Sequence, residues 1–121
     1  PNQCDEDDEN SLSAAICNGN KKLVDLLLKN GANPNHTDKM GRKPIHRIID
    51  SKKDSTMVAI ASALINKGAY VNAKTEKSKS TLLHFASYHD KPELLKFLLK
   101  NGADIESKNF NNINASDLAR T

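Results

Sequence analysis

A short phrase, Lys-Asn-Gly-Ala followed by Asn or Asp, occurs twice in this chain, at residues 29–33 and 100–104. A variant, Asn-Lys-Gly-Ala-Tyr, stands between them at 66–70, and an apolar cluster precedes each of the three. Self-similarity at a spacing of roughly thirty-odd residues predicts stacked helical units, because one such unit cannot bury its apolar face alone. Proteins built in this way usually work through an extended surface rather than a pocket.

Residues 76–108 contain the clearest unit. A short helix is expected to begin at Ser80 or Thr81, whose hydroxyl groups can accept hydrogen bonds from free backbone N–H groups. Pro92 suits the first turn of a second helix, which carries a broad apolar stripe on one face. Gly102 is expected to end that helix, because glycine adopts the left-handed backbone conformation without strain.

Two further phrases occupy equivalent positions between the Gly-Ala phrases. They are Gly-Arg-Lys-Pro-Ile-His at 41–46 and Thr-Leu-Leu-His-Phe-Ala at 81–86. Together the phrases resemble the ankyrin repeat, whose units contain a turn with glycine, a T-P-L-H-x-A-A helix and a second helix followed by G-A-D-x-N. The resemblance runs from about residue 10 to the end of the chain. It implies an all-α ankyrin-repeat solenoid of stacked helix-turn-helix units with short finger loops, about three repeats and a partial capping repeat.

The chain divides into a tail and a repeat domain. Residues 5–9 are all acidic and would repel one another if packed, so residues 1–9 are interpreted as a solvated, disordered tail. The alternative is a tail that covers the more basic repeat domain and shields it from other molecules. The resemblance implies that the domain, residues 10–121, contains units at approximately 10–37, 38–74, 75–107 and 108–121.

Two units depart from the pattern of the family. The second unit is longer than the third between its helix start and its glycine, and the extra residues at 50–55 are expected to form a surface loop. The third unit has an extra residue in its turn at 75–80 and lacks the glycine expected there. An irregular finger is therefore predicted at that turn.

No residue pattern indicates catalysis, a cofactor or a metal site. The resemblance implies that His46 and His84 are structural, and two histidines a whole repeat apart do not have the spacing of metal ligands. Nucleophile–base arrangements and glycine-rich phosphate loops are absent from the sequence. We therefore expect a protein that is not an enzyme and that binds no small-molecule substrate.

The cysteine content bears on the cellular compartment. Cys4 and Cys17 are the two cysteines of the chain, and they form neither a disulfide framework nor a zinc motif. A reducing compartment is the simplest interpretation, so a cytoplasmic protein is expected, with the nucleus as the alternative. No apolar run approaches the length needed to span a bilayer, so membrane insertion is not expected.

Basic residues gather in the expected fingers, where they would form a stripe that favours a partner with an acidic surface. They are Lys39, Arg42, Lys43, Lys74, Lys77, Lys79 and Lys108. The alternative is an ordinary solvated surface, since Asp38 and Glu76 interrupt the stripe. Nucleic acid is a less favoured partner, because exposed aromatic residues and an arginine-rich reading helix are lacking.

The resemblance also implies which positions contact a partner, because members of this family commonly bind through the fingers and the ends of the first helices. Mapped by register, these positions are Lys39, Met40, Arg42, Asp50, Ser51, Lys77, Ser80, Tyr88, His89, Phe110 and Asn111. Exposed aromatic residues and methionine are typical binding anchors, which singles out Met40, Tyr88 and Phe110. For the two aromatic residues, packing against an adjacent unit is the alternative.

The function expected from the resemblance is protein–protein interaction, without catalysis, through the fingers and the concave helical face. One alternative is a stand-alone inhibitor that masks a transcription factor or another signalling protein. The excess of Lys and Asn over Arg is compatible with an AT-rich coding sequence, and hence with an inhibitor directed at a host. The other alternative is a recruitment module cut from a larger enzyme, channel or effector.

Overall fold

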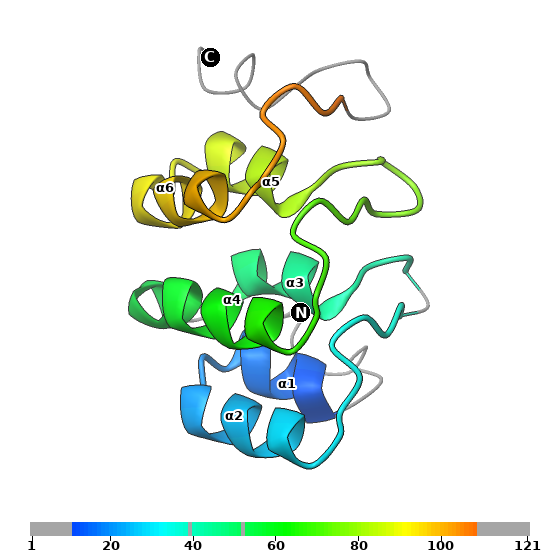
Figure 1. Ribbon diagram of the computed structural model, residues 1–121, viewed down its shortest axis with the longest axis vertical. Helices are drawn as coiled ribbons and strands as arrows, with labels where there is room; N and C mark the ends of the chain where they lie inside the picture. The colour runs from blue at the N-terminus through cyan, green and yellow to red at the C-terminus, as the bar shows by residue number, and fades with distance from the viewer. Residues whose placement is uncertain (1–10, 39, 52, 109–121) are drawn as a thin grey trace.

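Three helix pairs are stacked one on another in the computed structural model, which describes residues 11–38, 40–51 and 53–108 (Figure 1). The first pair is α1 (Ser11–Cys17) with α2 (Lys21–Lys29), and the third is α5 (Leu82–Tyr88) with α6 (Pro92–Lys100). In the second, α3 (Pro44–Arg47) runs on into the 3-10 turn η1 (Ile48–Asp50), and a second turn, η2 (Asp54–Thr56), leads into α4 (Met57–Asn66). The described residues contain no strand, so the predicted all-α solenoid is confirmed.

The helix ends form where the sequence predicts them. Of the two candidates for the start of α5, Thr81 is the capping residue, and its Oγ1 accepts a hydrogen bond from the backbone N–H of His84. The helix α6 begins at Pro92. It ends before Gly102, which has a φ of 93° in the left-handed region that glycine favours.

The same C-terminal cap closes all three second helices. After α2, α4 and α6 the backbone N–H of an alanine reaches back to a leucine carbonyl five residues earlier, at 3.0, 3.0 and 2.9 Å. The alanines are Ala32, Ala69 and Ala103, and the leucines are Leu27, Leu64 and Leu98. This bond satisfies a carbonyl that has no partner within the helix. The Gly-Ala phrase repeats because each unit uses it for the same cap.

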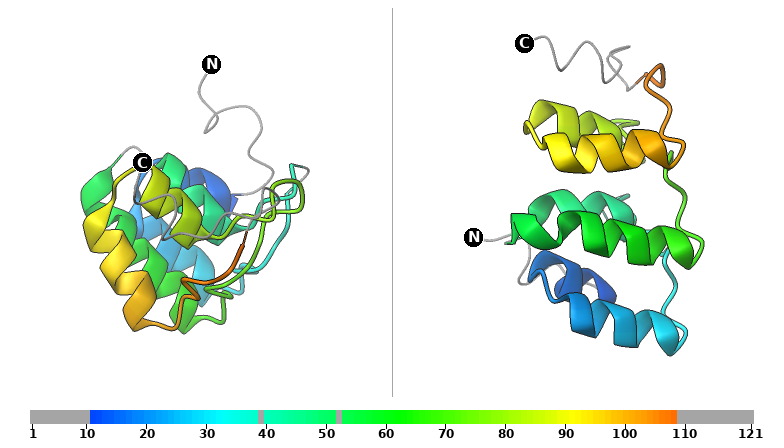
Figure 2. Two further views of the ribbon diagram at one scale, coloured as in Figure 1. Left: turned by 90° about the horizontal axis from the view of Figure 1, so that it is seen from above. Right: turned by 60° about the vertical axis from the view of Figure 1, so that its left-hand side comes forward.

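The core is aliphatic and lies within and between the helix pairs. Leu64 and Leu98 are fully buried, whereas Leu27, which occupies the equivalent position, is only partly buried. Leu64 lies in the middle pair, where α4 packs against both α2 and α6. Figure 2 shows the three pairs and the loops that project from one side of them.

The extra residues of the second unit lie between its paired helices, as predicted, but they are not a plain loop. They run from the end of η1 to the start of η2, and the segment packs on the turn of the first pair. A Cβ atom added at Gly19 would lie 2.8 Å from Cβ of Lys53 and 3.1 Å from Oγ1 of Thr56. The insertion therefore contacts the neighbouring unit. The acidic tail at 1–9 and the partial unit at 108–121, apart from residue 108, lie outside the described residues.

Candidate functional site on the fingers

The first finger, residues 38–43, is organised by the carboxylate of Asp38. Its Oδ1 accepts hydrogen bonds from the backbone N–H groups of Met40 and Arg42, at 2.9 and 2.8 Å. Its Oδ2 lies 3.2 Å from Nε of Arg42. The turn passes through Gly41, whose φ is 80°, and leaves the side chain of Met40 45% exposed at the tip.

The second finger, residues 74–80, is organised by the hydroxyl group of Thr75 in place of a carboxylate. Oγ1 of Thr75 accepts a hydrogen bond from the backbone N–H of Ser80 at 3.2 Å and lies 2.7 Å from the hydroxyl of Ser78. Lys79 takes the left-handed conformation, with φ of 57°, in a turn that lacks glycine. This turn therefore uses other residues than the family pattern. Its two ends are nevertheless joined, because the N–H of Thr75 donates a hydrogen bond to the carbonyl of Ser80 at 2.9 Å.

The two fingers are joined directly. The backbone N–H of Glu76 donates a hydrogen bond of 3.0 Å to the carbonyl of Gly41. A Cβ atom at Gly41 would lie 2.7 Å from Cβ of Glu76, so only glycine allows this approach. Each finger therefore supports the other at this contact.

His46 fastens the base of the first finger to the second. Its Nδ1 accepts the backbone N–H of Lys43 at 2.9 Å, and its Nε2 lies 2.8 Å from the carbonyl of Ala73. A carbonyl can only accept, so Nε2 carries the proton and the ring is neutral. Burial lowers the pKa of His46 from its ordinary value of 6.5, and the positive charge of Lys43 acts in the same direction.

In the third unit, Nδ1 of His84 accepts the backbone N–H of Thr81 at 3.1 Å. Both histidines are placed to hold backbone together.

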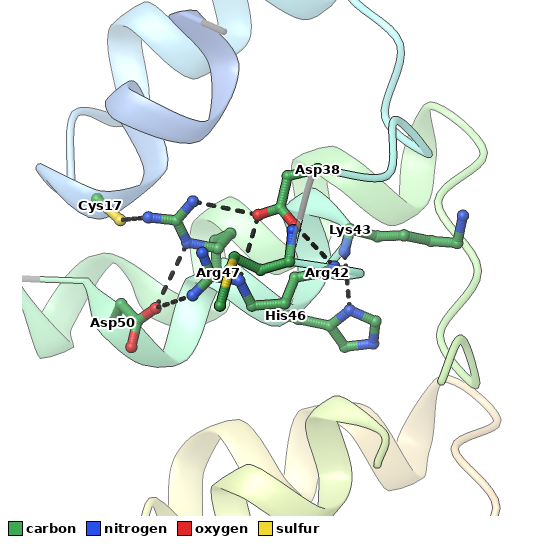
Figure 3. Close-up of polar contacts among 8 residues, drawn as sticks. Cys17, Asp38, Arg42, Lys43, His46, Arg47 and Asp50 are labelled. Carbon is green, nitrogen blue, oxygen red and sulfur yellow. Dashed lines mark hydrogen bonds and ion pairs between the residues drawn. The ribbon is translucent and has the colours of Figure 1, made fainter. Parts of the chain in front are cut away.

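A buried ion cluster lies beneath the first finger (Figure 3). Arg47 is fully buried, and its Nη2 donates to Sγ of Cys17 in the first unit at 3.0 Å. Its other guanidinium nitrogens face two carboxylates, at 3.7 Å from Asp38 and 3.4 Å from Asp50. Asp50 is also 3.8 Å from Arg42. Two arginines and two aspartates thus neutralise one another, with Arg47 and Asp38 buried and Arg42 and Asp50 partly exposed.

The structure places the positions predicted to contact a partner in different surroundings. Exposed side chains are those of Met40, Lys77, Tyr88 and His89. Arg42 and Asp50 are partly exposed and take part in the ion cluster. Ser51 and Ser80 are buried, so they do not form part of an exposed surface. The remaining three, Lys39, Phe110 and Asn111, lie outside the described residues.

Several basic residues of the predicted stripe are used within the chain. Nζ of Lys43 donates to Oγ1 of Thr37 at 2.8 Å, and Nζ of Lys74 donates to the carbonyl of Lys108 at 3.0 Å. Asp38 does not interrupt the stripe, because it is buried in the ion cluster. Lys77 and Lys79 remain exposed on the second finger, with Glu76 beside them.

The buried role of Arg47 was missed by sequence reasoning. A single arginine in a short helix gives no signal of burial on its own. The available signal was its position three residues after Pro44, on the turn of the first helix that faces the neighbouring unit. Two nearby acidic residues, Asp38 and Asp50, are in reach of that position and supply the charge that a buried guanidinium needs.

Within the described ranges, no three side chains of His, Cys, Asp or Glu come together as metal ligands would. None of the helices in this part of the chain has the length and apolar character needed to cross a membrane.

Comparison with known proteins agrees with this architecture. The profile of the family described as ankyrin repeats (3 copies) matches residues 12–109. The chain is 36% identical over 83 residues to the RelA-associated inhibitor of Mus musculus and 40% identical over 73 residues to an ankyrin repeat protein, FPV233, of fowlpox virus. It is 32% identical over 127 residues to the phosphocholine transferase AnkX of Legionella pneumophila.

The matches cover 69%, 60% and 95% of this chain, respectively. They cover only 10%, 14% and 12% of the relatives, so the chain corresponds to a small part of each. The family match spans most of the chain and includes residues of all three helix pairs of the described residues. The chain belongs to the ankyrin-repeat family.

Proposed function

We propose that this chain is a non-catalytic module that binds a protein partner through its fingers and the concave face formed by its first helices. Ankyrin repeats are a general protein-interaction fold. The observation that carries the proposal is the hydrogen bond from Glu76 to Gly41, because it joins the two fingers into one preformed surface. A surface that is already ordered loses little entropy on binding.

The exposed residues of this surface suggest the chemistry of the partner. Met40 and Tyr88 offer apolar contact area, and Tyr88 is 68% exposed with its ring edge-on to His89 at 5.1 Å between centroids. Lys77 and Lys79 add positive charge. We therefore propose a partner with an acidic surface and an apolar centre, in the cytoplasm or the nucleus.

The test is affinity capture from a cell lysate with mass spectrometry, using a Met40→Ala, Lys77→Ala, Tyr88→Ala variant. The matched control replaces exposed residues of the same kinds elsewhere, Leu26→Ala, Lys96→Ala and Tyr70→Ala. Circular dichroism establishes that both variants are folded. A protein retained by the wild type and the control but lost by the finger variant supports the proposal. Equal retention by all three proteins contradicts it.

Two more specific functions have support among the relatives. The similarity to part of a protein named as an inhibitor favours an inhibitor that masks a signalling protein or transcription factor. The similarity to part of a transferase favours a recruitment module of a larger protein. The native reading frame separates them, because a stop shortly after Thr121 supports the inhibitor and a long continuation supports the module.

A further inference from the structure

The edge of the stack opposite the fingers carries a cavity of about 330 Å³. It lies where the start of the second unit's α4 faces the turn between α5 and α6, at the left of Figure 1. This volume falls at the lower end of the range for ligand pockets, about 300–1,000 Å³. Its lining residues are Asp54, Ser55, Met57, Val58, Asp90, Lys91, Pro92, Glu93 and Leu94.

The insertion of the second unit builds one wall of this cavity. Lys53 and Thr56 rest against Gly19 in the first unit, which fixes the segment on one side. On the other side, the carboxylate of Asp54 pairs with Nζ of Lys91 in the third unit at 2.8 Å. The segment is thus held between the first and third units, and the cavity opens along it.

The floor and the rim of the cavity differ in chemistry. The floor is apolar, formed by the buried side chains of Met57 and Leu94 with the partly buried Val58. The rim carries exposed carboxylates. They belong to Asp54, Asp90 and Glu93.

The charge of the rim contrasts with the net charge of the chain, which is +3. Lys91 is the basic residue among the lining residues, and its ammonium group is already engaged by Asp54. Asp90 adopts a left-handed backbone, with φ of 56°, at the turn of the third unit, and Gly19 does so at the turn of the first, with φ of 67°. An aspartate at this position adds a charge to the rim that glycine would not supply.

We propose that this cavity docks a protein segment that presents an aliphatic side chain flanked by lysine or arginine. The aliphatic group would cover Met57, Val58 and Leu94, and the basic groups would pair with Asp90 and Glu93. Charge complementarity selects this occupant over an acidic segment, which the rim carboxylates repel. None of the lining residues belongs to the fingers at 38–43 and 74–80, so the proposal does not depend on binding through the fingers.

Nuclear magnetic resonance of the ¹⁵N-labelled full chain tests the proposal with two probe peptides. They are acetyl-Lys-Leu-Leu-Lys-amide and acetyl-Glu-Leu-Leu-Glu-amide, which differ only in the flanking charge. The basic peptide is expected to shift backbone amide signals of residues 53–58 and 90–95, and the acidic peptide is not. Raising the salt concentration from about 0.05 M to about 0.5 M should weaken binding several-fold, because it screens exposed charges.

Variants then test the rim and the floor separately. Asp90→Asn with Glu93→Gln keeps the shape of the rim, since asparagine tolerates the left-handed conformation, and should weaken binding several-fold. Ser55→Phe adds a ring at the wall to occupy the cavity and should abolish the shifts. The matched control, Asp25→Asn with Glu76→Gln, removes two carboxylates outside the cavity lining and should bind like the wild type.

Three results would overturn the proposal. They are absence of shifts with the basic peptide, equal binding of the acidic peptide, and unchanged affinity of the rim variant. A Met40→Ala, Lys77→Ala variant changes only finger residues outside the cavity lining and should bind the basic peptide normally. Failure of the cavity proposal is thereby distinguished from failure of the finger proposal.

Discussion

Arg47 donates a hydrogen bond of 3.0 Å to the sulfur atom of Cys17, across the boundary between the second and first units. Both side chains are fully buried. A buried guanidinium is stable only when its charge is neutralised and its N–H groups have acceptors. Asp38 and Asp50 supply the charge, and the Cys17 sulfur supplies an acceptor from the neighbouring unit.

Removing one carboxylate from this cluster should therefore destabilise the whole stack. Asp38→Ala is expected to lower the free energy of unfolding by about 3–5 kcal/mol, because it leaves a buried charge less compensated. The change also removes the acceptor that shapes the first finger. Urea unfolding followed by circular dichroism measures the effect. Asp25→Ala removes an exposed ion pair with Lys21 and should change stability by no more than about 1 kcal/mol.

Gly41 should be less replaceable than Gly31, although both have a positive φ. Alanine at either position is strained by about 1–3 kcal/mol. At Gly41 the added Cβ would also meet Cβ of Glu76 at 2.7 Å, whereas at Gly31 it meets nothing within 4 Å. Gly41→Ala should thus show the larger loss in thermal unfolding. Equal decreases in the unfolding temperature of the two variants would mean that the contact between the fingers contributes little to stability.

Stability should fall as the pH is lowered through the range in which His46 would become protonated. Burial holds the pKa of His46 in the folded chain below 6.5, its ordinary value and the value expected in the unfolded chain. The unfolded chain then binds more protons below about pH 6.5, so the contribution of neutral His46 is complete above that pH and is lost below it.

Urea unfolding of the wild type and of His46→Asn over this pH range isolates the effect. The two proteins differ only at residue 46, so the difference between the two curves reports His46. The stability difference should narrow as the pH falls below about 6.5, which is the unfolded pKa. A difference that is constant with pH would contradict the assigned neutral ring.

Asn72 joins the second unit to the third through two hydrogen bonds with the backbone. Its side chain donates to the carbonyl of Gly102 at 3.1 Å and accepts from the N–H of Asp104 at 2.7 Å. Asn72→Ala should therefore cost about 1–3 kcal/mol, at about 0.5–1.5 kcal/mol for each bond. Hydrogen exchange should accelerate at the amide of Asp104. Asn18→Ala, on an exposed turn, is the control and should leave that amide unchanged.

Equivalent leucines should differ in their contribution to stability. Leu64→Ala is expected to cost about 2–5 kcal/mol, because the side chain is fully buried in the middle pair. Leu27→Ala should cost less, since Leu27 is only partly buried in the terminal pair. Chemical denaturation of the two variants gives the comparison. Equal decreases in the free energy of unfolding would indicate that the side chain of Leu27 is as buried in solution as that of Leu64.

The sequence predicted what depends on local and repeated interactions. The caps at Thr81 and Gly102 and the start of α6 at Pro92 are each set by a few neighbouring residues, so their patterns were sufficient. The repeated phrases indicated the stack, because each unit makes the same cap.

What the sequence could not predict depends on contacts between units. Arg47 is buried by partners that lie in other segments of the chain. Ser80 was assigned to the surface by register, but it is buried, and its backbone N–H bonds to Thr75. The cavity forms where η2 lies close to the turn between α5 and α6 of the next unit, and no pattern in the sequence predicts that contact.

Asn35 makes the same two connections one unit earlier, to the carbonyl of Gly68 at 3.0 Å and from the N–H of Tyr70 at 3.3 Å. The asparagine and glycine are 33 residues apart in that connection and 30 in the next. The same connection therefore forms between neighbouring units that differ in length. Changes in length at the helix turns can create new surface, such as the wall at η2, while the asparagine connections between the units are kept.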